Sequence, residues 1–251
     1  MKLSFKDINI FAQLQRENDL YKHYQLDEVI ERYDSNFLEF IRTPSLTEMQ
    51  AGLAYLRQIH RNSGRNFLKV VFPQNQEIPY ELRQYLLENQ YEIGILEMYA
   101  IKPNIFSTAP QRTEVIVDYV TNETLEGYLH IHYEDALEWG ANYARAKRDM
   151  LRKDYELRRK AQIVAILHGK VIGSVDVIES EKIVEIDSLF VLPEHQKRGV
   201  GTKLQQFVMK HYASKIVVLV ADGEDTPREM YTKQGYSYIG KQYNALKTSL
   251  D

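Results

Sequence analysis

The sequence predicts an α/β (α+β) fold built in two consecutive parts. Three observations lead to this prediction. Residues 111–251 alternate between strand-like runs and runs with helical periodicity, residues 183–211 have the pattern of a strand, a glycine-containing turn and a helix, and the first half repeats the alternation more faintly. The chain has 251 residues, which suffices for one large domain or two small ones.

In the second half, apolar alternation predicts strands and 3.6-residue spacing predicts helices. Proline and small polar residues at 102–104 and 107–110 mark a linker before these elements. The turn His168-Gly169-Lys170 joins two strands into a hairpin. In chain order, we predict a strand at 114–120, helices at 124–146 and on to 160, strands at 162–167, 171–178 and 183–192, a helix after 201, a strand at 216–221, a short helix at 226–234 and a final strand at 236–246.

The first half carries a similar series, with strands predicted at 37–41, 67–72 and 91–101 and helices at 45–61 and 79–89. The segments 85–91 and 230–236 resemble each other, because each ends a helix and begins a strand with tyrosine. Between its first strand and helix, however, this half has only Arg42-Thr43-Pro44, without a glycine. We interpret residues 1–106 as a degenerate copy of the fold of residues 111–251, kept for structure, pairing or substrate placement. An unrelated α/β domain is the alternative.

Composition bounds the class of protein. The chain is 44% hydrophobic and 27% charged, as is typical of soluble globular proteins, and no apolar run reaches the roughly 18 residues of a membrane span. Acidic residues follow the first methionine too soon for a signal peptide. Because there is no cysteine, disulfides, thiolate metal sites and a cysteine nucleophile are excluded. The net charge of −3 gives no reason to expect nucleic acid, so we expect a cytoplasmic protein that binds neither nucleic acid nor membrane.

The stretch from Gln196 to Gly201 is the most informative of the chain. It follows an apolar strand, contains Gly199 and Gly201, and leads into an amphipathic helix. Glycines let a turn aim successive N–H groups into one hollow, and a helix N-terminus adds partial positive charge, so we predict a phosphate or pyrophosphate site. A Walker loop is excluded, because no G-x-x-x-x-G-K-[ST] occurs. A dinucleotide fingerprint is also excluded, because Leu204 stands where that motif has its third glycine or alanine.

With this Q-x-x-G-x-G loop, and with its order of elements over residues 111–251, the chain resembles the GNAT superfamily of acyl-CoA-dependent N-acyltransferases. The resemblance implies a mixed, mostly antiparallel sheet flanked by helices, in tandem if the first half is a second copy, and acetyl-CoA as donor substrate. It implies that the main chain of Leu189, Phe190 and Val191 pairs with the pantetheine arm and supplies the oxyanion contact. It further implies that the loop amides hold the pyrophosphate, with charge contributed by Lys197 and Arg198. The cofactor-binding loop then comprises Gln196, Lys197, Arg198, Gly199, Val200, Gly201 and Thr202.

The resemblance also implies catalytic residues. The segment Met230-Tyr231-x-Lys233-x-Gly235-Tyr236 is similar to the family's L-Y-x-K-x-G-F, whose tyrosine is the general acid near the thioester sulfur, and a phenol of pKa about 10 is protonated at neutral pH. Glu185 lies eleven residues before Gln196, where some members carry the general base, and strand alternation places Asp187 on the same face. A water chain in place of a dedicated base stays open. The family's asparagine near the start of the tyrosine-bearing helix has no counterpart at 223–227.

Direct attack by the amine fits this chain, because it has neither a cysteine nor a G-x-S-x-G serine. We therefore expect an N-acetyltransferase that moves an acetyl group from acetyl-CoA to a primary amine in a ternary complex. We expect no metal site, since His130 and His132 alone are too little for one and are expected at the surface. The alternative is a non-catalytic acyl-CoA-binding sensor or scaffold. The amine acceptor, the acyl chain length and the formation of a homodimer stay open.

Overall fold

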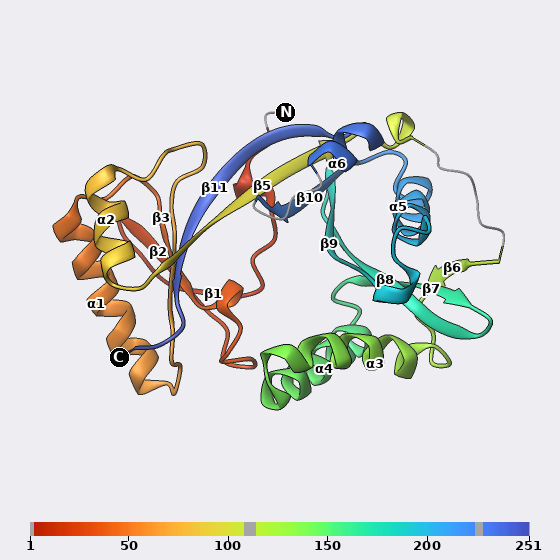
Figure 1. Cartoon of the computed structure of the whole chain (residues 1–251), viewed down its shortest axis with the longest axis horizontal. Coiled ribbons are helices and arrows are strands. Elements are labelled where there is room, and N and C mark those ends of the chain that lie inside the picture. The colour runs from red at the N-terminus through yellow and green to blue at the C-terminus, as the bar shows by residue number, and fades with distance from the viewer. Residues whose placement is uncertain (1–2, 108–113, 224–227, 251) are drawn as a thin grey trace. The chain divides into compact units, whose positions relative to one another are not determined.

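The computed structural model describes residues 3–107, 114–223 and 228–250. Contacts between residues divide the chain into two compact units, whose elements are labelled in Figure 1. Unit 1 comprises residues 1–98, 221–226 and 239–251, and unit 2 comprises residues 99–220 and 227–238. Three strands therefore contribute residues to both units, namely β5 (Glu92–Ile101), β10 (Ile216–Asp222) and β11 (Ser237–Lys247).

The sheet of unit 1 has the strand order β1-β2-β3-β4-β11-β5. Strand β3 runs parallel to β4, whereas the pairs β1/β2, β2/β3 and β4/β11 are antiparallel. We did not predict β1 or β2, because all five side chains of β1 are exposed and its sequence has no apolar alternation. The further strands are β1 (Gln13–Glu17), β2 (Tyr21–Gln25), β3 (Phe37–Phe40) and β4 (Leu68–Val71), with 3-10 turns at Phe5–Asp7 and Tyr33–Ser35.

Two helices complete unit 1, α1 (Leu46–Asn62) and α2 (Tyr80–Glu88). Helix α1 begins with a capping box, in which the Ser45 hydroxyl accepts from the Glu48 N–H at 3.3 Å and the Glu48 carboxylate accepts from the Ser45 N–H at 2.8 Å. Met49, Leu53 and Leu56 lie on one buried face of α1, as their spacing predicts, and join the apolar core of this unit.

The sheet of unit 2 has the order β5-β10-β9-β8-β7-β6, in which the pair β9/β10 is parallel and the pairs β6/β7, β7/β8 and β8/β9 are antiparallel. Helices α3 (Leu125–Ala136) and α4 (Ala141–Glu156) lie on one face and α5 (Val200–His211) on the other (Figure 1). The architecture is therefore the mixed, mostly antiparallel sheet flanked by helices that the sequence predicts. The remaining elements are β6 (Ile116–Tyr119), β7 (Ala161–Leu167), β8 (Lys170–Glu179), β9 (Ile183–Val191), α6 (Arg228–Gln234) and 3-10 turns at Pro103–Ile105, Leu137–Trp139 and Pro193–His195.

The end of the chain belongs to unit 1. In β11, Asn244 lies opposite Val71 and Lys247 lies opposite Leu68, both in β4. Local sequence patterns place a strand at 236–246 but carry no information on this long-range partner. The division into domains 1–106 and 111–251 stays a prediction. The two compact units do not follow this division, because unit 1 also contains residues 221–226 and 239–251.

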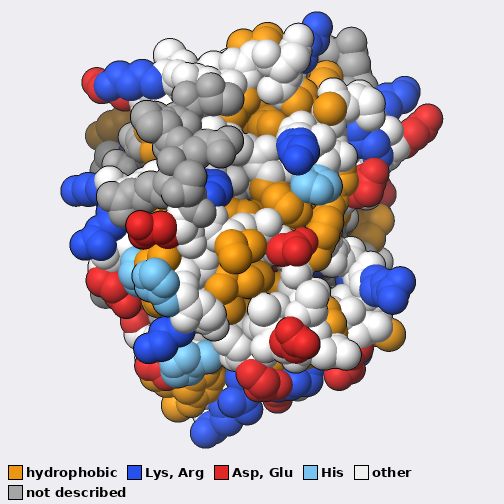
Figure 2. All heavy atoms as spheres, turned by 90° about the vertical axis from the view of Figure 1, so that its right-hand side faces the viewer, with side chains coloured by type: hydrophobic (Ala, Val, Ile, Leu, Met, Phe, Trp, Pro, Cys, Tyr) orange, Lys and Arg blue, Asp and Glu red, His pale blue; other side chains and the backbone are white. Residues whose placement is uncertain are grey.

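The exposed edge of unit 2 carries apolar side chains. Ile116 in the edge strand β6 is 62% exposed. Figure 2 shows the face of the molecule on this side, where apolar side chains gather in the middle and most of the lysine and arginine side chains lie toward the margin. Among the described residues, none of the helices combines the length and apolar character that a membrane span requires.

Candidate functional site: a phosphate loop at the end of strand β9

The loop between β9 and α5 bends sharply. After the 3-10 turn at Pro193–His195, Lys197 adopts a left-handed backbone with φ 54°, and Gly199, the N-cap of α5, has φ 82°. An added Cβ at Gly199 would meet no atom within 4 Å, so the space above this glycine is open. The left-handed conformation is the reason for a glycine at this position, because it costs a residue with a side chain about 1–2 kcal/mol.

This loop leaves a row of hydrogen-bond donors unused. Among the described residues, the main-chain N–H groups of Lys197 to Thr202 donate to no other group of the protein. The first N–H of the helix that finds a partner is that of Lys203, which donates to the Gly199 carbonyl at 3.0 Å. Residues 196–199 are exposed, so solvent or a ligand has access to these donors. Successive free N–H groups at a helix N-terminus are the usual arrangement for binding phosphate.

Gln196 differs from the rest of the predicted loop. Its N–H donates to the Pro193 carbonyl at 3.2 Å, and its side-chain Nε2 donates to the Val191 carbonyl at 3.0 Å. The main-chain N–H and one N–H of the side-chain amide are therefore used within the protein. Gln196 shapes the turn that presents the following amides, and its position in the motif does not by itself make it a ligand.

Strand β9 has a partly unpaired edge next to the loop. Its parallel pairing with β10 begins at Ile183↔Ile216 and ends at Ile186↔Leu219, although β9 continues to Val191. On its other side the strand stays paired, with Leu189 opposite Val175 in β8. The predicted pantetheine-binding residues Leu189, Phe190 and Val191 are half-buried and lie in the stretch that has parted from β10. On this edge the Val191 carbonyl already has a partner, because it accepts a hydrogen bond from the Gln196 side chain.

The two candidate acidic residues lie at the point where β9 and β10 part. Glu185 is only 6% exposed and lies opposite Val218 in β10, one residue before the pairing ends. Asp187 is the extra residue of a β-bulge, because Ile186 lies opposite Val177 and Ser188 lies opposite Asp176. The Asp187 carboxylate is 3.4 Å from the Lys160 ammonium. Asp187 therefore forms an ion pair within the protein, and Glu185 is the remaining candidate for the general base.

Tyr231 lies on α6 among other aromatic rings. Its ring centroid is 5.1 Å from that of Tyr99 and 5.5 Å from that of Tyr236. The Tyr236 hydroxyl donates to Gln205 Oε1 at 2.8 Å, which links this aromatic group to α5, the helix that begins at the phosphate loop. Burial raises the pKa of Tyr231, so its phenol stays protonated at neutral pH. Among the described residues, the Tyr231 hydroxyl has no hydrogen-bond partner.

Sequence reasoning missed a buried polar network between α3 and the sheet. The Tyr128 hydroxyl donates to Asp176 at 2.8 Å, and the Lys160 ammonium is 2.7 Å from the same carboxylate. On the same helix, His132 Nε2 is 2.9 Å from the Ser174 hydroxyl, and the ring centroid of His132 is 5.9 Å from that of Phe190. This network fixes β8 and, through the packing on Phe190, the back of β9.

His132 corrects an expectation. We expected His130 and His132 at the surface, but His132 is only 1% exposed, and burial lowers its pKa to about 3, with the charges of Lys147 and Lys160 adding to the effect. The four-residue spacing between Tyr128 and His132, which places both on the buried face of α3, was the signal available in the sequence. Within the part of the chain that the structure describes, no group of three or more acidic or histidine side chains is arranged to hold a metal ion. Most of the segment 223–227, where the family's asparagine is missing, lies outside the described residues.

Comparison with known families gives two matches. Residues 3–99 match a domain of unknown function (DUF5613), and residues 125–236 match the acetyltransferase (GNAT) family. No curated protein sequence matches the chain. The second match contains the predicted phosphate loop, the unpaired edge of β9 and Tyr231.

Solved structures extend the likeness to nearly the whole chain. A functionally unknown conserved protein from Staphylococcus epidermidis ATCC 12228 is 30% identical, with a TM-score of 0.92 over 99% of this chain and 98% of that one. A GCN5-related N-acetyltransferase from Kribbella flavida is 12% identical, with a TM-score of 0.60 over 94% and 89%. A tandem GNAT protein from the clavulanic acid biosynthesis pathway is 13% identical, with a TM-score of 0.53 over 86% and 75%. At such low identity, the last two similarities concern the fold.

Proposed function

We propose that this chain is an N-acetyltransferase that moves an acetyl group from acetyl-CoA to a primary amine, since residues 125–236 match the acetyltransferase (GNAT) family. One observation carries the proposal, namely the row of six N–H groups from Lys197 to Thr202 that donate to no other described group of the protein. They fit a diphosphate, because its oxygens accept several hydrogen bonds and its charge is favoured at a helix N-terminus. The side chains of Lys197 and Arg198 are exposed and add positive charge at the same place.

The unpaired edge of β9 supports the placement of the donor. Amide groups of pantetheine can add to an open strand edge as a further strand would, and Leu189 and Phe190 lie next to the loop on that edge. The main chain of the same strand then lies beside the thioester carbonyl, where an N–H group stabilises the developing negative charge.

Tyr231 is the proposed general acid for the departing thiolate. Its protonated phenol and the absence of a hydrogen bond to any described residue leave its proton available for transfer. Contacts with the rings of Tyr99 and Tyr236 hold the side chain in place.

Glu185 is the proposed general base. Its burial at the point where β9 leaves β10 favours a base shielded from bulk water. Glu185→Gln, which keeps the shape of the side chain, should lower kcat with little change in the affinity for acetyl-CoA. A variant with unchanged kcat would favour a water chain as the route for the proton.

We propose that residues 1–106 are a degenerate copy of the same fold. Unit 1 contains the sequence β3-α1-β4-α2-β5, and its loop before α1 contains a proline in place of glycines. The fold likeness to a tandem GNAT protein over 86% of this chain supports this reading.

A thiol-release assay with acetyl-CoA and a broad panel of primary amines tests the proposed activity. Turnover with at least one amine is the expected result. Tight calorimetric binding of acetyl-CoA without turnover on any acceptor would favour the alternative, a sensor or scaffold that binds acyl-CoA. No binding of acetyl-CoA at all would refute both functions.

A further inference from the structure

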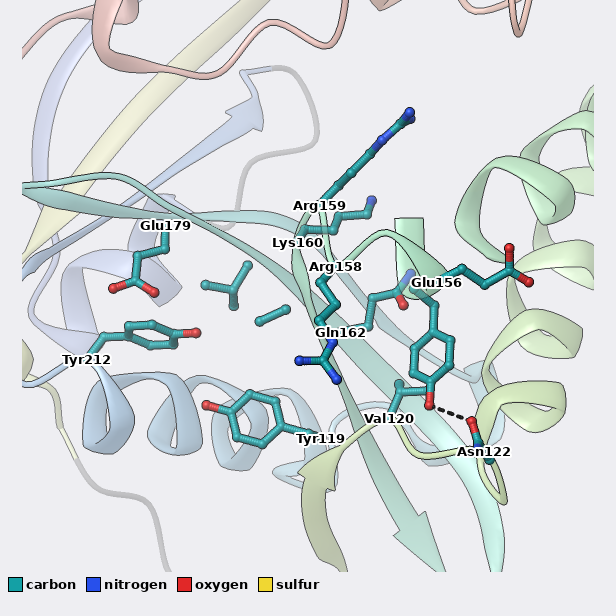
Figure 3. A pocket seen from close by; sticks show the side chains of 13 residues that line it. Tyr119, Val120, Asn122, Glu156, Arg158, Arg159, Lys160, Gln162, Glu179 and Tyr212 are labelled. Carbon is teal, nitrogen blue, oxygen red and sulfur yellow. Dashed lines mark hydrogen bonds between the residues drawn. The ribbon is translucent and has the colours of Figure 1, made fainter. Parts of the chain in front are cut away.

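Unit 2 contains a pocket remote from the predicted phosphate loop (Figure 3). It has a volume of about 820 Å³ and is formed by the end of β6, the turn after α4, the end of β8 and the residue that follows α5. Glu179 at the end of β8 lies next to the start of β9, whereas the phosphate loop follows the end of β9. A strand of nine residues spans about 30 Å, so the pocket and the loop lie at opposite ends of the same strand.

Three consecutive cations, Arg158, Arg159 and Lys160, line this pocket, and two of them are already paired. Arg159 lies 3.6 Å from Asp154, and Lys160 is held by three buried or half-buried carboxylates. In Figure 3, Arg158 extends into the space beside Tyr119 and Tyr212, whereas Arg159 and Lys160 point away from it. Among the described residues, Arg158 has neither an ion pair nor a side-chain hydrogen bond.

The backbone at Arg158 favours a different residue. Helix α4 ends with the Arg159 N–H donating to the Asp154 carbonyl at 3.0 Å and the Arg158 N–H donating to the Tyr155 carbonyl at 3.2 Å. This is a Schellman motif, in which the residue at the position of Arg158 is left-handed and is usually glycine. Arg158 adopts φ 52° there. An arginine therefore occupies a position where glycine would be more stable, and this arginine points into a pocket.

Tyrosine hydroxyls provide the other polar groups of the pocket. Burial raises the pKa of Tyr212, and the neighbouring Tyr119 phenol adds to the effect, so the Tyr212 hydroxyl stays protonated and can donate a hydrogen bond. The Tyr155 hydroxyl donates to Asn122 Oδ1 at 2.9 Å. Of the two carboxylates in the lining, Glu179 is neutralised by Lys215 at 2.6 Å and Glu156 points away in Figure 3.

We propose that this pocket binds a small anionic ligand whose carboxylate or phosphate group is held by Arg158 and by the hydroxyls of Tyr119 and Tyr212, which line the same space. A guanidinium binds either group through two parallel hydrogen bonds, and phenol rings provide the walls for an attached organic part. The site is additional to the acyl-transfer site and does not depend on the proposed function.

Titration of the full chain with inorganic phosphate and, separately, with succinate tests the proposal. The NMR signal of the Arg158 Nε–Hε group reports this pocket alone, which separates it from phosphate bound at the loop. We expect a saturable shift with at least one of the two probes, and the tighter probe identifies the chemical class. No shift with either probe would overturn the proposal.

Two variants complete the test. Arg158→Gly should raise the melting temperature by about 2 °C or more, because glycine suits the left-handed position, and should weaken calorimetric binding of the tighter probe at least about tenfold. Arg159→Gln, the neighbouring control, should bind as the wild type does. Equal affinity of the wild type and Arg158→Gly for the probe would contradict the site. Because Arg158→Gly is expected to be more stable than the wild type, weaker binding by this variant could not be ascribed to unfolding.

Discussion

The sharpest prediction compares two glycines that share a backbone conformation but differ in location. Gly199 in the phosphate loop has φ 82°, and Gly169 in the β7–β8 hairpin has φ 79°. At both positions an added Cβ would meet no atom within 4 Å. A side chain therefore costs the same at either site, about 1–2 kcal/mol of left-handed strain, and Gly199→Glu and Gly169→Glu should each lower the melting temperature by a few degrees.

The two variants should differ in their binding of acetyl-CoA. At position 199 a glutamate carboxylate would lie within the loop whose N–H groups at residues 197–202 have no acceptor in the described protein, and would repel a pyrophosphate bound there. A hydrogen bond to a charged group contributes about 1.5–3 kcal/mol, so displacement of the pyrophosphate from two N–H groups weakens binding by about 10²- to 10⁴-fold. At position 169 the added carboxylate is outside the loop, and affinity should stay within about twofold of the wild type.

Isothermal titration calorimetry with acetyl-CoA, supported by thermal melts of all three proteins, gives both quantities. Wild-type affinity in Gly199→Glu would refute the assignment of the phosphate loop. Equal losses of affinity in both variants would show that general destabilisation, and not the loss of loop contacts, is responsible.

Three further predictions concern the acid, the buried network and pH. Tyr231→Phe removes the proton donor but keeps the ring, so kcat should fall about 10²-fold or more with little change in the Kd for acetyl-CoA, and an unchanged kcat would exclude this tyrosine as the acid. Asp176→Asn removes the nearest carboxylate, at 2.7 Å, from the buried Lys160 ammonium, so urea denaturation should show about 3 kcal/mol less stability, and a loss below about 1 kcal/mol would contradict the role of this pair. Burial lowers the pKa of His23 and of His60 from 6.5 to about 4, so the unfolded chain binds protons that the folded chain does not, and stability should fall as the pH drops from about 6.5 to 4. Between pH 7 and pH 5 each histidine accounts for about 2 kcal/mol of this loss. The free energy of unfolding of His60→Gln should therefore fall less over this pH range than that of the wild type. An equal fall in both proteins would be incompatible with a buried neutral His60.

Local patterns predicted the elements that contain the site. The apolar run of β9, the two glycines of the loop and the periodicity of α5 are all encoded within residues 183–211, so element type and order could be derived without knowledge of the fold. The β-bulge at Asp187 and the pairing of this residue with Lys160 could not, because both depend on the register with β8 and on a side chain 27 positions away. The same holds for the hydrogen bonds of Gln196 within the turn, which its position in the motif does not reveal, whereas its role as a ligand stays a prediction.

The C-terminal strand shows why the second half cannot be treated as an independent folding unit. Residues 244–247 of β11 pair with residues 68–71 of β4, and Tyr243 and Ala245 are buried in the core of unit 1. A fragment that begins at residue 111 would carry the phosphate loop and Tyr231 but would expose the edge and the apolar side chains of β11. The half that carries the proposed site is therefore coupled to residues 3–99 through covalent continuity and shared strands. Loss of activity in such a fragment would reflect loss of folding, which is why each experiment above uses point variants of the full chain.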